Sequence, residues 1–267
     1  MRFSPGSAIP LARLTVRAER SSARRPVTGG TGALTVPTDP DLHLVFDVAA
    51  WLAAGVLARL LYVWRLREAA ARTVAGIGPG YVLALAAGIV AGAWGFGTLG
   101  SGLARPSHSL AGALAGGIVA VELYKAARGL TGSTGLIWVG PLALGIAVGR
   151  WGCLFAGLAD DTYGTPTSLP WGVDLGDGVR RHPVQVYESL AMLAFLGAYL
   201  SGLVRRAAWT RRSAFYLFVL CYAAQRFVWE FLKPYPDIVP PLNLFQLLAL
   251  AMILYALLFD ARARRTF

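Results

Sequence analysis

Two arginines, Arg150 and Arg226, carry the clearest chemical potential because each lies in or at the end of a long apolar segment. Tyr222 and Glu230 flank Arg226 at intervals of four residues, which places the three side chains on one helix face. A charge in apolar surroundings is costly unless it is paired or hydrated. Guanidinium groups bind phosphate oxygens through two parallel hydrogen bonds, so the two arginines could bind a phosphate. The alternative is a structural Arg226–Glu230 ion pair with the arginine extended toward water.

The composition is typical of an integral membrane protein. The 267 residues are 56% hydrophobic and 15% charged, with a mean hydropathy of +0.55. The formal net charge of +11 does not indicate nucleic-acid binding, because arginines at the ends of apolar segments are better explained as topology signals. Two distant cysteines and three scattered histidines offer neither a disulfide framework nor zinc-site spacing, so we expect no metal and no cofactor.

Seven apolar segments are long enough to cross a bilayer, which takes about 20 residues in a helix. Backbone polar groups must be satisfied internally in lipid, so these segments should be helices. The sequence therefore predicts an all-α integral membrane protein, a bundle of about seven transmembrane helices within residues 41–267. Residues 1–40 are basic and rich in Gly, Pro, Ser and Thr, and we expect a flexible tail. The expected spans are 43–64, 79–99, 109–127, 134–154, 184–204, 213–232 and 242–260.

The distribution of cations predicts the orientation of the bundle. With the N-terminus outside and the C-terminus in the cytoplasm, twelve cations lie at the cytoplasmic ends and five at the outer ends. The twelve are Arg65, Arg67, Arg72, Lys125, Arg128, Arg205, Arg206, Arg211, Arg212, Arg262, Arg264 and Arg265. The five are Arg105, Arg150, Arg180, Arg181 and Lys233.

A polar loop, Gly149–Glu188, then faces outward between the fourth and fifth spans. It is either an ordinary water-exposed loop or the cap of a site in the membrane, and the charges within the spans favour the second. The phosphate available at that depth belongs to a phospholipid headgroup. The residues therefore suggest a lipid-handling cavity, without distinguishing binding from catalysis.

Gly112 and Gly116 of the third span form a GxxxG pair, which indicates close helix packing in lipid. No internal repeat at a fixed period is visible, which weighs against a transporter built from inverted halves.

Beyond the tail, over residues 43–260, the sequence resembles the prolipoprotein diacylglyceryl transferases of bacterial membranes. Four blocks carry the resemblance, and they occur in the family's order with helices between them. They are Gly149-Arg150-Trp151-Gly152-Cys153; Pro166-Thr167 with Leu169-Pro170-Trp171-Gly172-Val173; His182-Pro183-Val184-Gln185-Val186-Tyr187-Glu188; and Tyr222, Arg226, Phe227, Glu230 and Lys233.

The resemblance implies transfer of the sn-1,2-diacylglyceryl group from phosphatidylglycerol to the lipobox cysteine of a prolipoprotein, with release of glycerol phosphate. Its expected partners are phosphatidylglycerol, the prolipoprotein signal peptide and membrane lipid, and we expect a monomer in the bacterial cytoplasmic (inner) membrane. The alternative is a non-catalytic or altered-acceptor paralogue that binds anionic phospholipid.

The resemblance also suggests roles for individual residues. Arg150 and Arg226 would stabilise the departing phosphate, Tyr222 would position the headgroup, and Glu230 would orient Arg226. A histidine begins the third span in typical members and is a candidate base; His108 is the nearest equivalent here, one turn from Ala111, which occupies that position. The residues expected to contact substrate, besides the two arginines, are His182, Gln185, Tyr187, Glu188, Gly152 and Gly164.

The signature block departs from the family pattern at two places. Cys153 replaces an asparagine, and we interpret it as a small buried residue rather than a nucleophile. A glutamate is absent in register, and Asp160 and Asp161 either replace its role or are solvated loop acids. These changes keep the non-catalytic alternative open.

Overall fold

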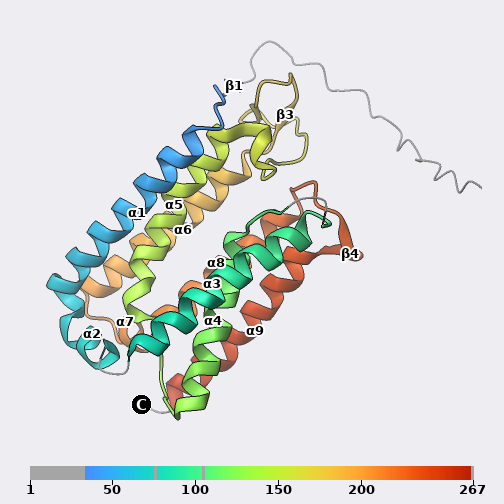
Figure 1. Ribbon diagram of the computed structural model, residues 1–267. Helices are drawn as coiled ribbons and strands as arrows, with labels where there is room; N and C mark the ends of the chain where they lie inside the picture. The colour runs from blue at the N-terminus through green and yellow to red at the C-terminus, as the bar shows by residue number, and fades with distance from the viewer. Residues whose placement is uncertain (1–33, 75–76, 104–105, 266–267) are drawn as a thin grey trace, which may run out of the picture.

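Long helices dominate the protein, whose computed structural model describes residues 34–74, 77–103 and 106–265. Within this described part, six helices are long and apolar enough to cross a membrane, which confirms the expected all-α membrane fold. A seventh long helix, α8, has 17 residues and is shorter than the other six. The seven, shown in Figure 1, are α1 (Leu42–Leu61), α3 (Pro79–Gly100), α4 (Leu110–Arg128), α5 (Val139–Ala156), α6 (Val184–Val204), α8 (Ala214–Glu230) and α9 (Leu244–Arg265). Short segments continue or join them: a π-helical turn (Tyr62–Leu66), α2 (Arg67–Val74), α7 (Trp209–Arg212) and 3₁₀ turns at Leu136–Trp138 and Gly157–Asp160.

Local sequence signals set several helix ends. Pro79 stands in the first turn of α3, where its missing N–H costs nothing. Ser109 precedes α4, and its side chain accepts a hydrogen bond from the backbone N–H of Gly112 at 3.2 Å. Gly129 ends α4 with φ 64°, a left-handed conformation that glycine adopts without steric cost. These signals explain why the spans begin and end close to their expected limits.

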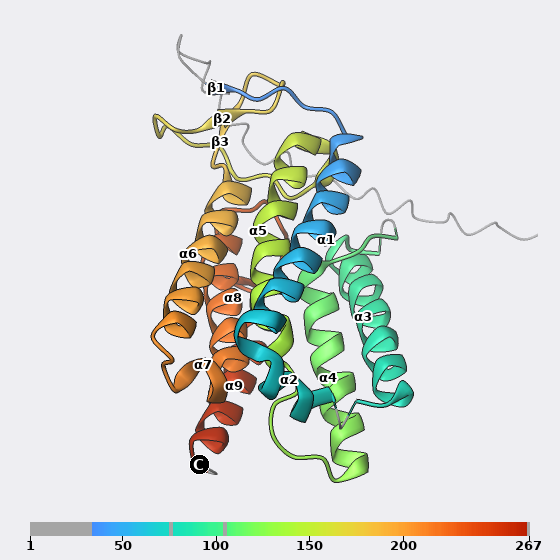
Figure 2. The same cartoon turned by 90° about the vertical axis from the view of Figure 1, so that its left-hand side faces the viewer.

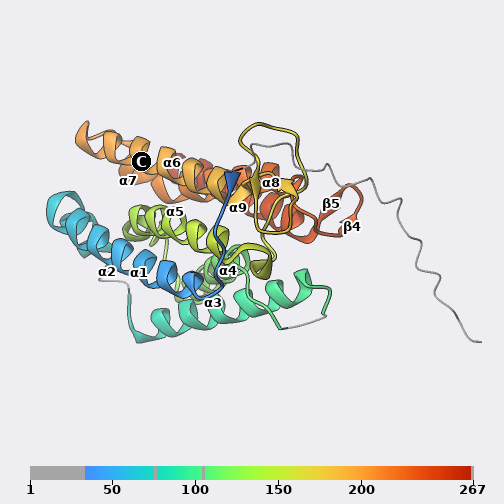
Figure 3. The same cartoon turned by 90° about the horizontal axis from the view of Figure 1, so that it is seen from above.

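The helices pack in two groups that Figure 1 shows side by side. In one group α5 lies between α1 and α6, as the view from above shows (Figure 3). In the other, α4 packs on α3 and also contacts α9, which packs on α8. The apolar side chains of α1 and α3 are largely exposed, so these two helices present their surface to lipid.

Small strands cover one end of the bundle (Figure 2). The strand β1 (Leu34–Thr35) runs parallel to β2 (Val173–Asp174), which pairs antiparallel with β3 (Arg180–Arg181). A hairpin of β4 (Asp237–Val239) and β5 (Leu242–Asn243) leads into α9. The loop between α5 and α6 is therefore anchored by backbone hydrogen bonds rather than by side chains alone.

Seven residues that the sequence placed in the tail lie within the described part of the chain. Residues 34–40 lie against the α5–α6 loop, where Val36 donates a backbone hydrogen bond to Asp174 at 2.9 Å and is buried beside Leu154. The expected boundary after residue 40 stays a prediction, and residues 34–40 contact the helical part of the chain. The remainder of the expected tail, residues 1–33, lies outside the described residues, as does Arg105.

Glycines bring α3 and α4 into backbone contact. A Cβ atom added at Gly92 would collide with the carbonyl oxygen of Gly112, and one added at Gly116 would collide with that of Gly88. The close packing expected from the Gly112–Gly116 pair is confirmed, with a matching glycine pair on α3.

Because no space exists for a methyl group at this contact, Gly92→Ala should destabilise the protein by about 1–3 kcal/mol. Thermal unfolding in detergent micelles measures the loss. Gly95→Ala is the matched control on the same helix, since a Cβ there would meet nothing within 4 Å. Equal melting temperatures for the two variants would contradict the packing argument.

Candidate active site

Arg150 of α5 and Arg226 of α8 meet at one carboxylate, Glu188 of α6. Arg150 pairs through Nε with Oε2 of Glu188, and Arg226 Nη1 donates to Oε1 at 3.0 Å. Both arginines are buried, with exposed fractions of 6% and 4%, and Glu188 is 1% exposed. Charges this deep are stable only when they are paired. Glu188 thus fixes the two guanidinium groups beside each other, although they come from different helix groups.

The buried ion-pair network extends to two more charged residues. Nε of Arg226 forms an ion pair with Oε1 of Glu230 at 2.7 Å, and Lys233 Nζ lies 2.7 Å from Glu188 Oε1 and 3.4 Å from Glu230 Oε1. Three cations and two carboxylates give the network one net positive charge. An anion placed here would complete the charge balance.

Polar residues of β5 and α9 support the network through hydrogen bonds to Glu230 and to each other. Asn243 donates from its side chain to Glu230 Oε2 at 3.4 Å, and its Oδ1 accepts from the backbone N–H of Gln246 at 3.0 Å. The side chain of Gln246 in turn accepts from the backbone N–H of Asn243 at 2.9 Å. This reciprocal pair caps the start of α9 and holds the amide of Asn243 toward the carboxylate.

Tyr222 lies one turn before Arg226 on α8 and is fully buried. Its hydroxyl has no hydrogen-bond partner among the described residues. A buried hydroxyl left without a partner is uncommon in folded proteins, and here it is one turn away from a guanidinium group. Tyr222 therefore offers a donor for a ligand held by the arginines.

The loop residues expected to contact substrate lie near the same end of the bundle. Gln185 donates from its amide to Thr162 Oγ1 at 3.4 Å. The hydroxyl of Tyr187 accepts from the indole N–H of Trp171 at 2.8 Å. Burial lowers the pKa of His182, which favours its neutral form, and its Nδ1 has no partner among the described residues. Of this set only Glu188 enters the ion-pair network.

Arg181 and Asp177 stabilise the outer part of that loop. The guanidinium group of Arg181 donates to both oxygens of Asp177 at 2.6 and 2.7 Å and holds the pKa of this carboxyl below its usual range. Asp177 is exposed and Arg181 is half-buried, so the pair shapes the loop rather than the buried site.

Gly152 and Gly164 permit close approaches between elements. A Cβ at Gly152 would lie 2.8 Å from Cβ of Phe46 on α1, and one at Gly164 would collide with the carbonyl oxygen of His182. These positions bring α1 against α5 and fold the loop tightly over the helix ends. Their expected contact with substrate stays a prediction.

His108 lies apart from the ion-pair network. It is exposed, just before α4, and its ring packs against Trp94 of α3 with centroids 6.1 Å apart. Its expected role as a base stays a prediction, and its placement favours another proton acceptor.

Comparison with known proteins now gives the family. A model of the prolipoprotein diacylglyceryl transferase family matches residues 34–261. The chain belongs to this family. Three similar proteins carry the name phosphatidylglycerol–prolipoprotein diacylglyceryl transferase. The one from Finegoldia magna is 31% identical over 48% of this chain and 50% of its own length, and the one from Gloeobacter violaceus is 34% identical over 53% and 55%. The one from Synechococcus elongatus is 27% identical over 82% and 73%. The chain thus spans about half the length of the first two relatives.

Three residues of the ion-pair network and its supports were not predicted to lie there from the sequence. Lys233 occupies the last position of the family's fourth block, where the sequence alone did not indicate that it turns inward to Glu188. The sequence also did not predict that Asn243 and Gln246 support the network. The available signal was the pair of amides in the otherwise apolar stretch that begins α9.

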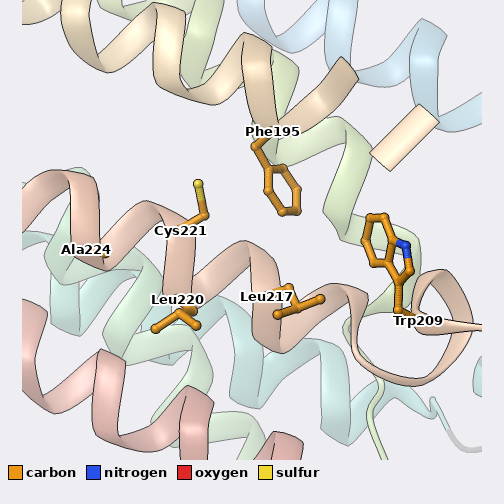
Figure 4. A pocket seen from close by; sticks show the side chains of 6 residues that line it. All are labelled: Phe195, Trp209, Leu217, Leu220, Cys221 and Ala224. Carbon is orange, nitrogen blue, oxygen red and sulfur yellow. The ribbon is translucent and has the colours of Figure 1, made fainter. Parts of the chain in front are cut away.

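An apolar pocket of about 440 Å³ lies beside the part of α8 that precedes Arg226, toward the N-terminus of this helix (Figure 4). Its lining is Phe195, Trp209, Leu217, Leu220, Cys221 and Ala224. No charged side chain takes part, so this pocket suits hydrocarbon rather than a headgroup.

The network predicts a large cost for removing its central carboxylate. In Glu188→Gln, three buried cations face one carboxylate, so we expect a loss of about 3–5 kcal/mol in the free energy of unfolding. Thermal or denaturant unfolding in micelles measures it. The control is Asp177→Asn, because an exposed pair contributes about 0–1 kcal/mol after solvent screening. A Glu188→Gln protein as stable as the control would refute the central role of this residue.

Proposed function

We propose that the protein transfers the sn-1,2-diacylglyceryl group of phosphatidylglycerol to the lipobox cysteine of a prolipoprotein, and releases glycerol phosphate. The observation that supports this most directly is the meeting of Arg150 and Arg226 at Glu188 in a buried network with one excess positive charge. The family and the printed names of the similar proteins point to the same reaction.

The excess charge suits a phosphate diester better than a neutral lipid. Contacts with Glu188 and Glu230 engage Nη1 and Nε of Arg226, whereas a guanidinium group carries five N–H donors. The remaining donors can bind phosphate oxygens. The hydroxyl of Tyr222 supplies a further hydrogen bond, which leaves the acyl chains to lie along apolar helix surfaces.

The reaction forms one bond and breaks one. The acceptor cysteine sulfur, as thiolate, attacks the glycerol carbon that bears the phosphate; the C–S bond forms and the C–O bond breaks. The electron pair leaves on the phosphate oxygen, so negative charge on the glycerol phosphate increases. Preorganised guanidinium groups in a site without bulk water stabilise that charge most strongly in the transition state.

The cation distribution supports an outward-facing site in the bacterial cytoplasmic membrane, with the N-terminus outside and the C-terminus in the cytoplasm. The C-terminal ends of α5 and α8 and the N-terminal end of α6 would then lie toward the outer leaflet, the side on which Figure 2 shows the small strands. Both the lipid headgroup and an exported prolipoprotein are accessible from that side.

The competing proposal is a paralogue that binds anionic phospholipid without transferring it. The displacement of the third-span histidine to the exposed position of His108 favours this alternative. Complementation of cells depleted of their own transferase separates the two: growth supports the enzyme, and no growth despite membrane insertion supports the binding protein.

Arg150→Ala and Arg226→Ala should each lower transfer by at least about 10²-fold, because each removes a donor to the developing charge. The assay measures thioether formation on a lipobox peptide in vesicles that contain phosphatidylglycerol. Arg128→Ala is the control, because Arg128 is the last residue of α4 and is exposed. If Arg150→Ala or Arg226→Ala keeps its fold and transfers at the rate of the control, that arginine does not bind the phosphate.

His108→Ala tests the remaining histidine of the third span. Because this side chain is exposed and packs on Trp94, we expect transfer to fall by less than about tenfold, whereas loss of a general base lowers rates by about 10²–10⁴-fold. The same vesicle assay measures the loss of transfer, and Trp94→Phe is the control for the packing of the two rings. A loss in the larger range for His108→Ala alone would identify His108 as the base.

A further inference from the structure

Three potential metal ligands converge beside Arg150. His43 comes from the first turn of α1, Cys153 from the last turns of α5, and Asp160 from the 3₁₀ turn that follows. Nε2 of His43 lies 3.2 Å from Oδ1 of Asp160 and 3.7 Å from Sγ of Cys153. All three ligand atoms lie within 4.8 Å of one another. Spacing along the chain gave no sign of this cluster, because its members are up to 117 positions apart (160 − 43).

A carboxylate outside the cluster orients the imidazole. Nδ1 of His43 lies 3.0 Å from Oδ2 of Asp47, one turn further along α1. When Nδ1–H donates to this carboxylate, the lone pair of Nε2 points toward Cys153 and Asp160. A histidine held by a carboxylate in this way is the usual arrangement for zinc ligands.

The two separations from Nε2 of His43 fit a small tetrahedral ion, and Cys153 and Asp160 lie within 4.8 Å of each other. Zinc binds histidine nitrogen and carboxylate oxygen at about 2.0–2.2 Å and cysteine sulfur at about 2.3 Å, so ligand atoms around it lie about 3.3–3.6 Å apart. The separations of 3.2 and 3.7 Å from Nε2 need adjustments of only tenths of an ångström. Three protein ligands leave the fourth position open, as in catalytic zinc sites.

The surrounding charges also suit a divalent ion. With zinc bound, Asp160 and a Cys153 thiolate would carry two negative charges that the divalent ion balances. Asp47 is partly exposed to solvent, so the charge of Arg150 stays with the ion-pair network. Nη1 of Arg150 donates to Sγ of Cys153 at 3.7 Å. The cluster and the ion-pair network therefore share Arg150, which connects the phosphate position to the metal position.

We propose that His43, Cys153 and Asp160 bind a zinc ion whose open position takes the sulfur of the acceptor cysteine. The second part rests on the proposed function, whereas the first does not. The proposal replaces the expectation, drawn from the sequence, that the protein has no metal and that Cys153 is only a packing residue.

The ion-pair network offers no group that would form the acceptor thiolate. A bound zinc ion would supply this step. A thiol that coordinates zinc loses its proton to solvent. A thiolate formed there would attack the glycerol carbon, so that the C–S bond forms as the C–O bond to phosphate breaks, and Arg150 and Arg226 would stabilise the charge of the leaving glycerol phosphate. Atoms and charge balance without a further reactant.

Metal binding is tested on the full-length protein in detergent micelles. We expect one zinc per chain by elemental analysis, and a cysteine-to-cobalt charge-transfer band when Co²⁺ replaces it. Cys153→Ser should abolish the band, while Cys221→Ser, the other cysteine and outside the cluster, should retain it. Asp47→Asn keeps the ligands and should weaken zinc binding about 10–100-fold. Less than a tenth of an equivalent of zinc in the folded wild-type protein, or an unchanged band in Cys153→Ser, overturns the proposal.

The role of the metal is tested by adding lipobox peptides to the cobalt protein. A cysteine peptide should shift the cobalt spectrum and a serine peptide should not; identical spectra overturn the thiol-binding part. Vesicle assays separate this proposal from the proposed function. Transfer that survives complete zinc removal overturns the metal role and leaves the transferase assignment intact. Stoichiometric zinc with no transfer by the wild-type protein keeps the metal site and rejects the transferase.

Discussion

The structure depends on the burial of Glu188 among three cations. Arg150, Arg226 and Lys233 reach this single carboxylate from α5, from α8 and from the segment after it. None of these charges could remain in an apolar bundle alone, so each stabilises the burial of the others. Because α5 and α6 belong to one helix group and α8 to the other, the same interaction that neutralises the charges also joins the two groups. Assembly of the site and association of the helices are thus one event.

Arg150 links two regions of different chemistry. On one side it contacts Glu188, and on the other its Nη1 contacts Cys153, which lies less than one turn further along α5. A ligand that changed the charge at either region would alter the electrostatic potential at the other, because little water separates them. This arrangement suits a transfer reaction, in which a nucleophile must gain charge before the leaving group does.

The sequence predicted the helices well because the period and length of apolar runs are local properties. It also predicted the Arg226–Glu230 contact, since four residues separate the two on one helix. Contacts that depend on how helices pack were beyond it: Lys233 reaches Glu188 across 45 positions, and His43 reaches Cys153 across 110. The pairing of Leu34 and Thr35 with a strand about 140 positions later was likewise not predictable from local sequence.

The departures of this chain from the family pattern are spatially related. Cys153 stands where typical members have asparagine, and Asp160 stands near the position of an absent glutamate; in the fold both meet His43. Independent losses of function would leave unrelated residues in such positions. Here the two substitutions instead bring together a thiol, a carboxylate and an oriented imidazole, while the arginines, Tyr222 and Glu230 keep the family pattern. The ion-pair network therefore keeps the residues of the family's motif, and the departures lie on the other side of Arg150, around His43.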